Sequence, residues 1–275
     1  MPAIDRGSVA IDSSGRLVNS AGKIARVNVL RDMVRNQRWA VIPTSFANGT
    51  ACSWNPMGST SVTAYGSNTN LGRAFSAATP HGRVRRGVLT SAATANSSGG
   101  VRLSSNSTHS LSNFEPMRLT WQFGGADAAA VANVFSVSGF VAQSGEIGGS
   151  AFPSVGMIAF GAKVGDTELS FLHGTSGVAV SEGALGVNFP ANSGDEADLY
   201  EASIWQDNAA EARVNWSIRN LKNDAVASGV VTTDLPGLTT SLYFHSMRGN
   251  GGTALAVSVV FGAAEYGDDS RVAFS

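Results

Sequence analysis

Strict alternation of apolar and polar residues between positions 199 and 231 constrains the fold more than any other feature of this chain. In its middle part Val214, Trp216 and Ile218 share one face, and polar side chains occupy the other. A period of two predicts strands with one buried face, and short polar turns between them predict an antiparallel meander. The predicted strands are residues 199–207, 211–219 and 226–231, with turns at 208–211 and 222–224.

Strand periodicity also recurs on both sides of this meander. Residues 255–262 are apolar on both faces, which predicts a central strand that is covered on both sides. Many short strands with Gly, Asn and Asp turns predict an all-β chain that folds as an antiparallel β-sandwich or jelly roll. The other predicted strands are residues 83–90, 117–123, 131–137, 155–162, 169–173 and 241–247.

The N-terminal part of the chain lacks this regular pattern. Residues 25–38 have apolar residues at helical spacing, which predicts one short helix in a mostly extended segment. We therefore divide the chain into three parts. They are an N-terminal assembly or attachment segment (1–42), an irregular connecting region packed on the sandwich (43–82), and the jelly-roll sandwich (83–275).

Charge is distributed unevenly. Residues 1–102 hold 12 basic and three acidic residues, a net charge of +9, whereas residues 103–275 carry −10. A basic segment suits docking on the acidic sandwich of the same or a neighbouring copy, or on another acidic partner. The arginines are scattered and not interleaved with aromatic residues, so we expect no nucleic-acid binding. The candidate interface residues are Arg26, Arg31, Arg35, Arg38, Arg83, Arg85 and Arg86.

The sequence does not contain the signals of several kinds of protein. Cys52 is the single cysteine, so neither an intrachain disulfide nor a thiolate metal site is expected. The N-terminus has no apolar core of a signal peptide, and no apolar run reaches the roughly 20 residues of a membrane helix. We expect a protein made in a cytoplasm, without membrane insertion.

Residues that could carry catalysis do not form a recognised constellation. The histidines are His81, His109, His173 and His245; the second pair, at strand ends, could meet in space, but none has the spacing of a zinc site. Acidic residues cluster at 195–198 and 268–269. Each cluster fits a solvated turn better than a glycosidase pair, and the first, near Asn192, could hold calcium. We expect no catalytic residues, no cofactor and no enzymatic activity.

An exposed aromatic residue would offer a surface for stacking a sugar ring. Trp205 lies opposite the face of Tyr200 and Ile204, so it is a candidate glycan contact if its face is exposed. Contact with a second sheet is the alternative.

Several short segments also occur in an order that resembles a known family. Their sequence resembles the lectin-like (concanavalin-type) jelly-roll domains of tail-fibre, appendage and decoration proteins of tailed bacteriophages. The first 80 residues fall outside the resemblance. The segments are residues 117–123, 156–161, 165–174, 199–205, 212–218, 232–236 and 255–266.

The resemblance implies a virion structural protein, made in the host cytoplasm, that assembles through its N-terminal region. It implies a homotrimer or larger assembly with other virion proteins, which displays the sandwich for host-surface contact or virion decoration. A host surface glycan is an implied partner. A carbohydrate-binding module is the alternative function, and a polysaccharide-degrading enzyme on a jelly roll is the third.

Overall fold

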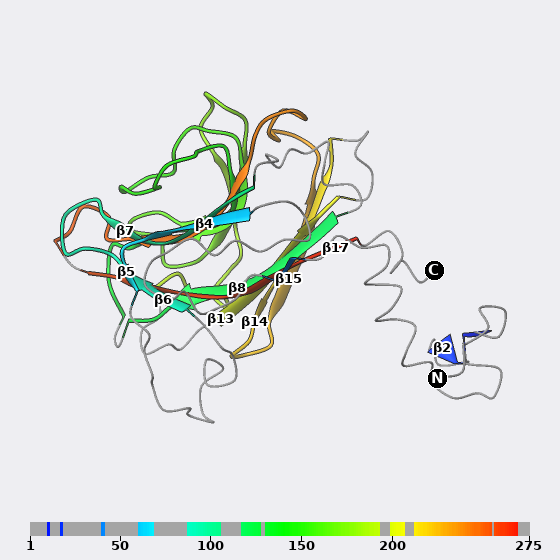
Figure 1. Ribbon diagram of the computed structural model, residues 1–275, viewed down its shortest axis with the longest axis horizontal. Coiled ribbons are helices and arrows are strands. Elements are labelled where there is room, and N and C mark those ends of the chain that lie inside the picture. The colour runs from blue at the N-terminus through cyan, green and yellow to red at the C-terminus, as the bar shows by residue number, and fades with distance from the viewer. Residues whose placement is uncertain are drawn as a thin grey trace. The chain divides into compact units, whose positions relative to one another are not determined.

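Two antiparallel sheets stacked face to face form the body of the molecule (Figure 1). The computed structural model describes residues 10–11, 17–18, 40–41, 60–68, 87–105, 117–127, 130–192, 199–206, 212–254 and 256–268. The chain divides into Met1–Trp39 and Ala40–Ser275, and both sheets belong to the second unit. In the first unit, β1 (Ala10–Ile11) pairs with β2 (Leu17–Val18).

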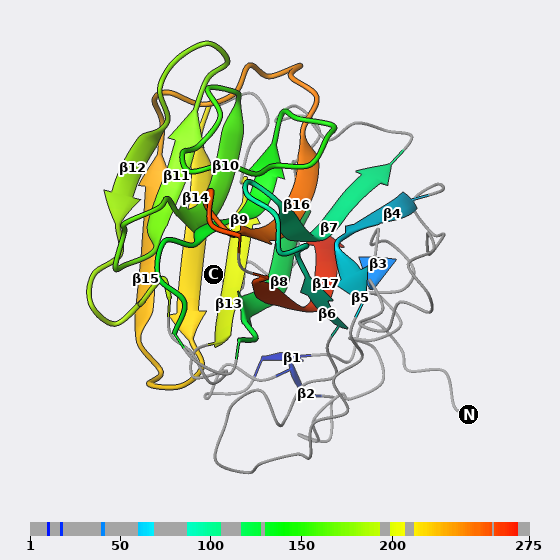
Figure 2. The same ribbon diagram turned by 90° about the vertical axis from the view of Figure 1, so that its left-hand side faces the viewer.

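Seven strands form one sheet, which runs from β12 at the left to β4 at the right in Figure 2. Every pairing in it is antiparallel. Its strands, in spatial order, are β12 (Ser181–Ala184), β11 (Ser170–Gly174), β10 (Met157–Ala162), β9 (Phe135–Val141), β16 (Tyr243–Gly249), β7 (Ser98–Ser105) and β4 (Thr60–Tyr65).

Eight strands form the other sheet, again with antiparallel pairing throughout. The short strand β3 (Ala40–Val41) pairs with β17 beside the main path. The other strands, in spatial order, are β15 (Val226–Val231), β14 (Val214–Asn220), β13 (Leu199–Trp205), β8 (Met117–Gly125), β17 (Ser258–Asp268), β6 (Gly87–Thr90) and β5 (Ser67–Asn68).

The predicted meander is β13–β14–β15, and its pairing is confirmed. Ile204 lies opposite Trp216 between the first two strands, and Ile218 lies opposite Ala227 between the next two. The all-β sandwich is confirmed as well, since no helix occurs among the described residues. The predicted helix at 25–38 lies outside those residues.

Some predicted boundaries were wrong. The strand expected at 131–137 is β9, which begins at Phe135; before it, Asn133 has a positive φ of 60° and belongs to a turn. Strands β7 and β12 were missed because their Gly, Ser and Glu residues hide the apolar alternation.

Part of the region between residues 43 and 82 belongs to the sheets themselves. Strand β4 pairs with β7 in the seven-stranded sheet, and β5 pairs with β6 in the other. The chain crosses between them at Gly66, whose φ is +81°. A side chain there would be strained and would collide with the carbonyl group of Thr90, so this position requires glycine.

Aromatic side chains fill the space between the two sheets. Trp121 of β8 is fully buried, and its ring centre lies 5.3 Å from that of Phe244 and 6.0 Å from that of Phe160. Phe171 stacks on Trp216 at 4.6 Å. Since Phe244, Phe160 and Phe171 come from the seven-stranded sheet, these ring contacts hold the two layers together.

A second apolar cluster lies on the outer face of the seven-stranded sheet. Phe140 and Ile158 point into the core, so by alternation their neighbours Val141 and Met157 point outward, yet both are fully buried. The segment between β9 and β10 supplies cover from Ile147, Phe152 and Val155, and Val164 and Val180 also pack there. The middle of this outer face is therefore filled with side chains, and polar groups are left to its two sides.

Candidate functional site

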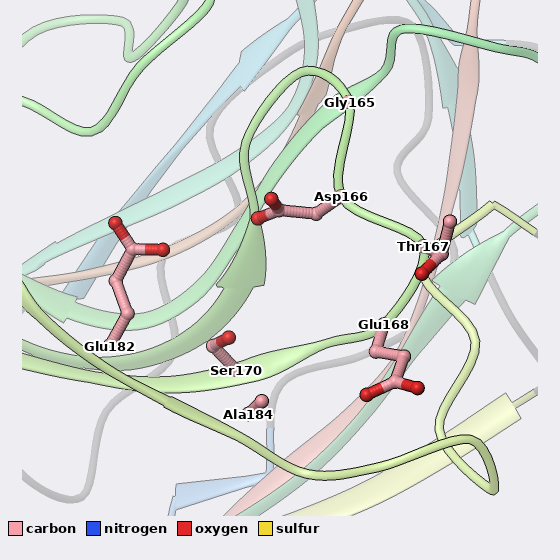
Figure 3. A pocket seen from close by; sticks show the side chains of 7 residues that line it. All are labelled: Gly165, Asp166, Thr167, Glu168, Ser170, Glu182 and Ala184. Atoms are coloured by element: carbon pink, nitrogen blue, oxygen red, sulfur yellow. The ribbon is translucent and has the colours of Figure 1, made fainter.

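A polar pocket opens at the β11–β12 side of the outer face of the seven-stranded sheet (Figure 3). Glu182 pairs with Leu172, and Ala184 pairs with Ser170, so these side chains lie on the outer face. The turn before β11 lines the rest of the pocket. Its volume is about 370 Å³, within the range of about 300–1,000 Å³ typical of small-molecule sites. We call it the acidic pocket; its lining is Gly165, Asp166, Thr167, Glu168, Ser170, Glu182 and Ala184.

Lysine 163 holds two of the three carboxylates in place. Its Nζ donates to both oxygens of Glu182, at 2.8 Å each, and its backbone N–H donates to Asp166 Oδ2 at 3.0 Å. The hydrogen bond with Glu182 raises the pKa of Lys163, so it stays charged at neutral pH. Among the described residues, the carboxylate of Glu168 has no partner.

The lining of the acidic pocket is suited to hydrogen-bond donors. Figure 3 shows the carboxylates of Asp166, Glu168 and Glu182 around the opening, with Ser170 at its base. An ionised carboxylate accepts hydrogen bonds only, and its bonds are stronger than those of neutral acceptors. Within the described part of the chain, no group of three or more His, Cys, Asp or Glu side chains is arranged to hold a metal ion.

The acidic pocket was not predicted from the sequence. Glu182 is 14 residues or more from the other two acids, and only the β11–β12 hairpin brings them together. The alternation of Asp166 and Glu168 just before a predicted strand was the available signal. The acidic cluster at 195–198 that was considered instead lies outside the described residues, and Asp268 ends β17.

The two described histidines are not neighbours. His173 faces the interior side of β11, where it stacks on Phe171 at 6.0 Å, with Nδ1 3.4 Å from the carbonyl oxygen of Asp234. His245 lies on the outer face of β16 and is fully buried. Strands β10 and β9 separate them, so they do not form a joint site.

Trp205 lies on the outer face of the eight-stranded sheet, since Ile204 before it points into the core. It pairs with Arg118 on one side and Asn215 on the other, and its side chain is partly exposed. The alternative of contact with the second sheet is therefore wrong. The next row on this face carries hydroxyl groups, with Thr120 Oγ1 2.9 Å from Ser203 Oγ.

The candidate interface arginines, residues 26, 31, 35, 38, 83, 85 and 86, all lie outside the described residues. No described helix is long and apolar enough to cross a membrane.

Similarity to known proteins is limited to the fold. No protein-family model matches the sequence, and no curated protein is significantly similar to it. Among solved structures, a protein of unknown function from Shewanella oneidensis MR-1 is 14% identical over 91% of this chain and 97% of that one, with a TM-score of 0.54. Peanut lectin is 12% identical over 84% and 97% of the two chains, with a TM-score of 0.43. An endo-β-1,4-glucuronan lyase from the fungus Trichoderma reesei is 10% identical over 84% and 94%, with a TM-score of 0.49.

The fold is a lectin-like β-sandwich. Within the resemblance seen in the sequence, the concanavalin-type sandwich is thus confirmed. None of these three structures is of a bacteriophage, so the virion context stays a prediction. A sandwich fold does not by itself decide between binding and catalysis.

Proposed function

We propose that this protein binds a neutral carbohydrate in the acidic pocket. The observation that carries the proposal is the pocket's lining, which combines three carboxylates with the hydroxyl groups of Thr167 and Ser170. A sugar offers many hydroxyl donors close together, and carboxylates accept two of them at a time. Gly165 and Ala184 leave room for a ring to approach.

Charge selects a neutral ligand over an anionic one. Asp166, Glu168 and Glu182 carry three negative charges, against the single positive charge of Lys163. A carboxylated or sulfated sugar would be repelled, and its own oxygens would find no donors beyond the lysine. A neutral hexose or a short neutral oligosaccharide meets neither obstacle.

Binding without turnover fits the pocket better than hydrolysis. Glycoside hydrolysis uses two carboxyl groups on opposite sides of the scissile bond, one of them protonated. Here Lys163 bonds to both Glu182 and Asp166, which fixes the orientation of the two carboxylates. Glu168 alone is unengaged, so the pair that hydrolysis requires is incomplete.

Glycan-array binding tests the proposal with the full chain. We expect binding to neutral glycans, and we expect Glu168→Gln to weaken it about tenfold or more, the cost of losing a charge-assisted hydrogen bond. Asp224→Asn is the matched control, because Asp224 is an exposed acid that pairs with Arg219 outside the pocket. Binding that is unchanged by Glu168→Gln would contradict the proposal.

Assembly into a virion is the second candidate function. What supports it is an apolar strip on the edge strand β15, where Val226 and Val230 are 64% and 49% exposed. Exposed valines on an edge strand favour contact with another protein. We expect a homotrimer by native mass spectrometry, and Val226→Lys to weaken it. A monomer at high concentration would count against this role.

A further inference from the structure

A second polar site lies on the same outer face, on its other side. Arg102 of β7 pairs with Thr63 of β4 and with His245 of β16, so the three residues form one row across the sheet. Tyr243 shares this face because it is two residues before His245. Arg102 and the acidic pocket on β11 are four strand spacings apart, about 19 Å. They are separate sites.

Two neighbouring side chains hold the guanidinium group of Arg102 in place, but no carboxylate among the described residues balances its charge. Its Nη2 donates to Thr63 Oγ1 at 3.1 Å, and its Cζ lies 5.7 Å from the ring centre of Tyr243. Its Nε is buried and has no hydrogen-bond partner. In the described part of the chain no carboxylate forms an ion pair with Arg102.

The neighbouring His245 is neutral at neutral pH, so it does not change the charge of the row. Burial, with a smaller contribution from the positive charge of Arg102, lowers the pKa of His245 to about 4. Its Nε2 lies 2.8 Å from the carbonyl oxygen of Gln143 and donates to it. At neutral pH the row therefore carries one positive charge, that of Arg102, beside a partly exposed tyrosine.

We propose that Arg102 and Tyr243 form a binding site for a hexuronic acid, whose carboxylate would pair with the guanidinium. An arginine fork matches a carboxylate with two parallel hydrogen bonds, and the end of the guanidinium away from the buried Nε is the end that such a ligand would meet. Arg102 lies over one face of the tyrosine ring, which leaves the other face for the sugar ring, and the Thr63 hydroxyl can accept from a sugar hydroxyl. The buried apolar cluster between the two sites prevents them from merging.

The site at Arg102 and Tyr243 is distinct from the acidic pocket and suits an anionic sugar, whereas the pocket suits a neutral one. Binding at Arg102 therefore does not depend on binding in the acidic pocket.

Isothermal titration calorimetry of the full chain tests it, with sodium glucuronate and a glucuronic acid oligomer as probes. We expect binding of both, at least tenfold weaker binding to Arg102→Gln, and partial retention in Arg102→Lys, which keeps the charge without the fork. Arg219→Gln is the matched control, since that exposed arginine pairs with Asp224 on the other sheet. Thermal unfolding of each variant confirms that it is folded, and Tyr243→Leu provides a second variant that leaves Arg102 intact.

Three outcomes would overturn the inference. They are unchanged glucuronate binding in both Arg102→Gln and Tyr243→Leu, glucose binding that Arg102→Gln weakens as much as it weakens glucuronate binding, and acetate or sulfate binding as tight as that of glucuronate. The last would mean a simple anion site without sugar recognition. Glu168→Gln should leave glucuronate binding intact, and Arg102→Gln should leave neutral-glycan binding intact, so failure at one site is distinguishable from failure at the other.

Discussion

The indole Nε1–H of Trp121 donates to Ser138 Oγ 2.8 Å away, across the interior from the eight-stranded sheet to the seven-stranded one. Ser138 Oγ in turn donates to Ser246 Oγ at 3.1 Å. All three residues are buried, so this is a polar connection inside an otherwise apolar core. It fixes the position of β8 relative to β9 and β16.

Trp121→Phe should therefore destabilise the sandwich. The change removes the donor and part of the ring volume, and we expect a loss of about 1–3 kcal/mol in the free energy of unfolding, measured in urea. Trp205→Phe is the control on the outer face and should cost clearly less. Equal losses would mean that the hydrogen bond between the sheets does not contribute.

A buried ion pair also joins the sheets. Arg248 of β16 donates to Asp127, which follows β8; their side chains are 3% and 11% exposed. Arg248→Met removes the charged partner of a largely buried carboxylate and should lower the free energy of unfolding by about 3–5 kcal/mol. Adding Asp127→Leu should restore much of that loss. If the double variant is no more stable than the single one, the pair is not the cause.

Burial of His245 makes stability depend on pH. Its pKa is lowered to about 4 in the folded chain from 6.5, so between these values the unfolded chain binds a proton that the folded chain does not. Stability therefore rises with pH in this window. The contribution of His245 to the free energy of unfolding should fall by about 2 kcal/mol from pH 7 to pH 5. In urea titrations at a series of pH values, His245→Gln should remove this part of the dependence of stability on pH. An unchanged pH dependence would mean that His245 is not its source.

Substitution of Trp205 tests whether the outer face of the eight-stranded sheet contacts a glycan. If its partly exposed ring stacks on a sugar, Trp205→Ala should weaken binding of an extended glycan about two- to tenfold. Binding at the acidic pocket should not change, because the two side chains lie on the outer faces of different sheets. Glycan arrays with Trp205→Ala and Glu168→Gln side by side separate the two surfaces.

The fold could be predicted where alternation was strong. Each strand of the meander has apolar residues at every second position, and its pairing partner follows directly in sequence. Strand β12, with the sequence Ser-Glu-Gly-Ala, could not be found this way, because an edge strand needs no buried face. The covered outer face was also unpredictable: Met157 and Val141 are buried by Ile147, whose loop gives no periodic signal.

The candidate sites depend on register, which the sequence does not show. Glu182 joins the acidic pocket because β12 pairs with β11 in one particular register. Arg102 lies in one row with His245 although 143 positions separate them in the chain. A single-residue slip in either pairing would turn these side chains to the other face. The sequence did place Trp205 opposite Ile204, since that relation is local.

Calorimetric titration of a neutral glycan selected on the array, into wild type, Glu168→Gln and Asp224→Asn, is the sharpest test of carbohydrate binding in the acidic pocket. We expect one site per chain, a loss of about tenfold or more in affinity for Glu168→Gln, and wild-type affinity for Asp224→Asn. Equal affinity in all three proteins would contradict the assignment of carbohydrate binding to the acidic pocket.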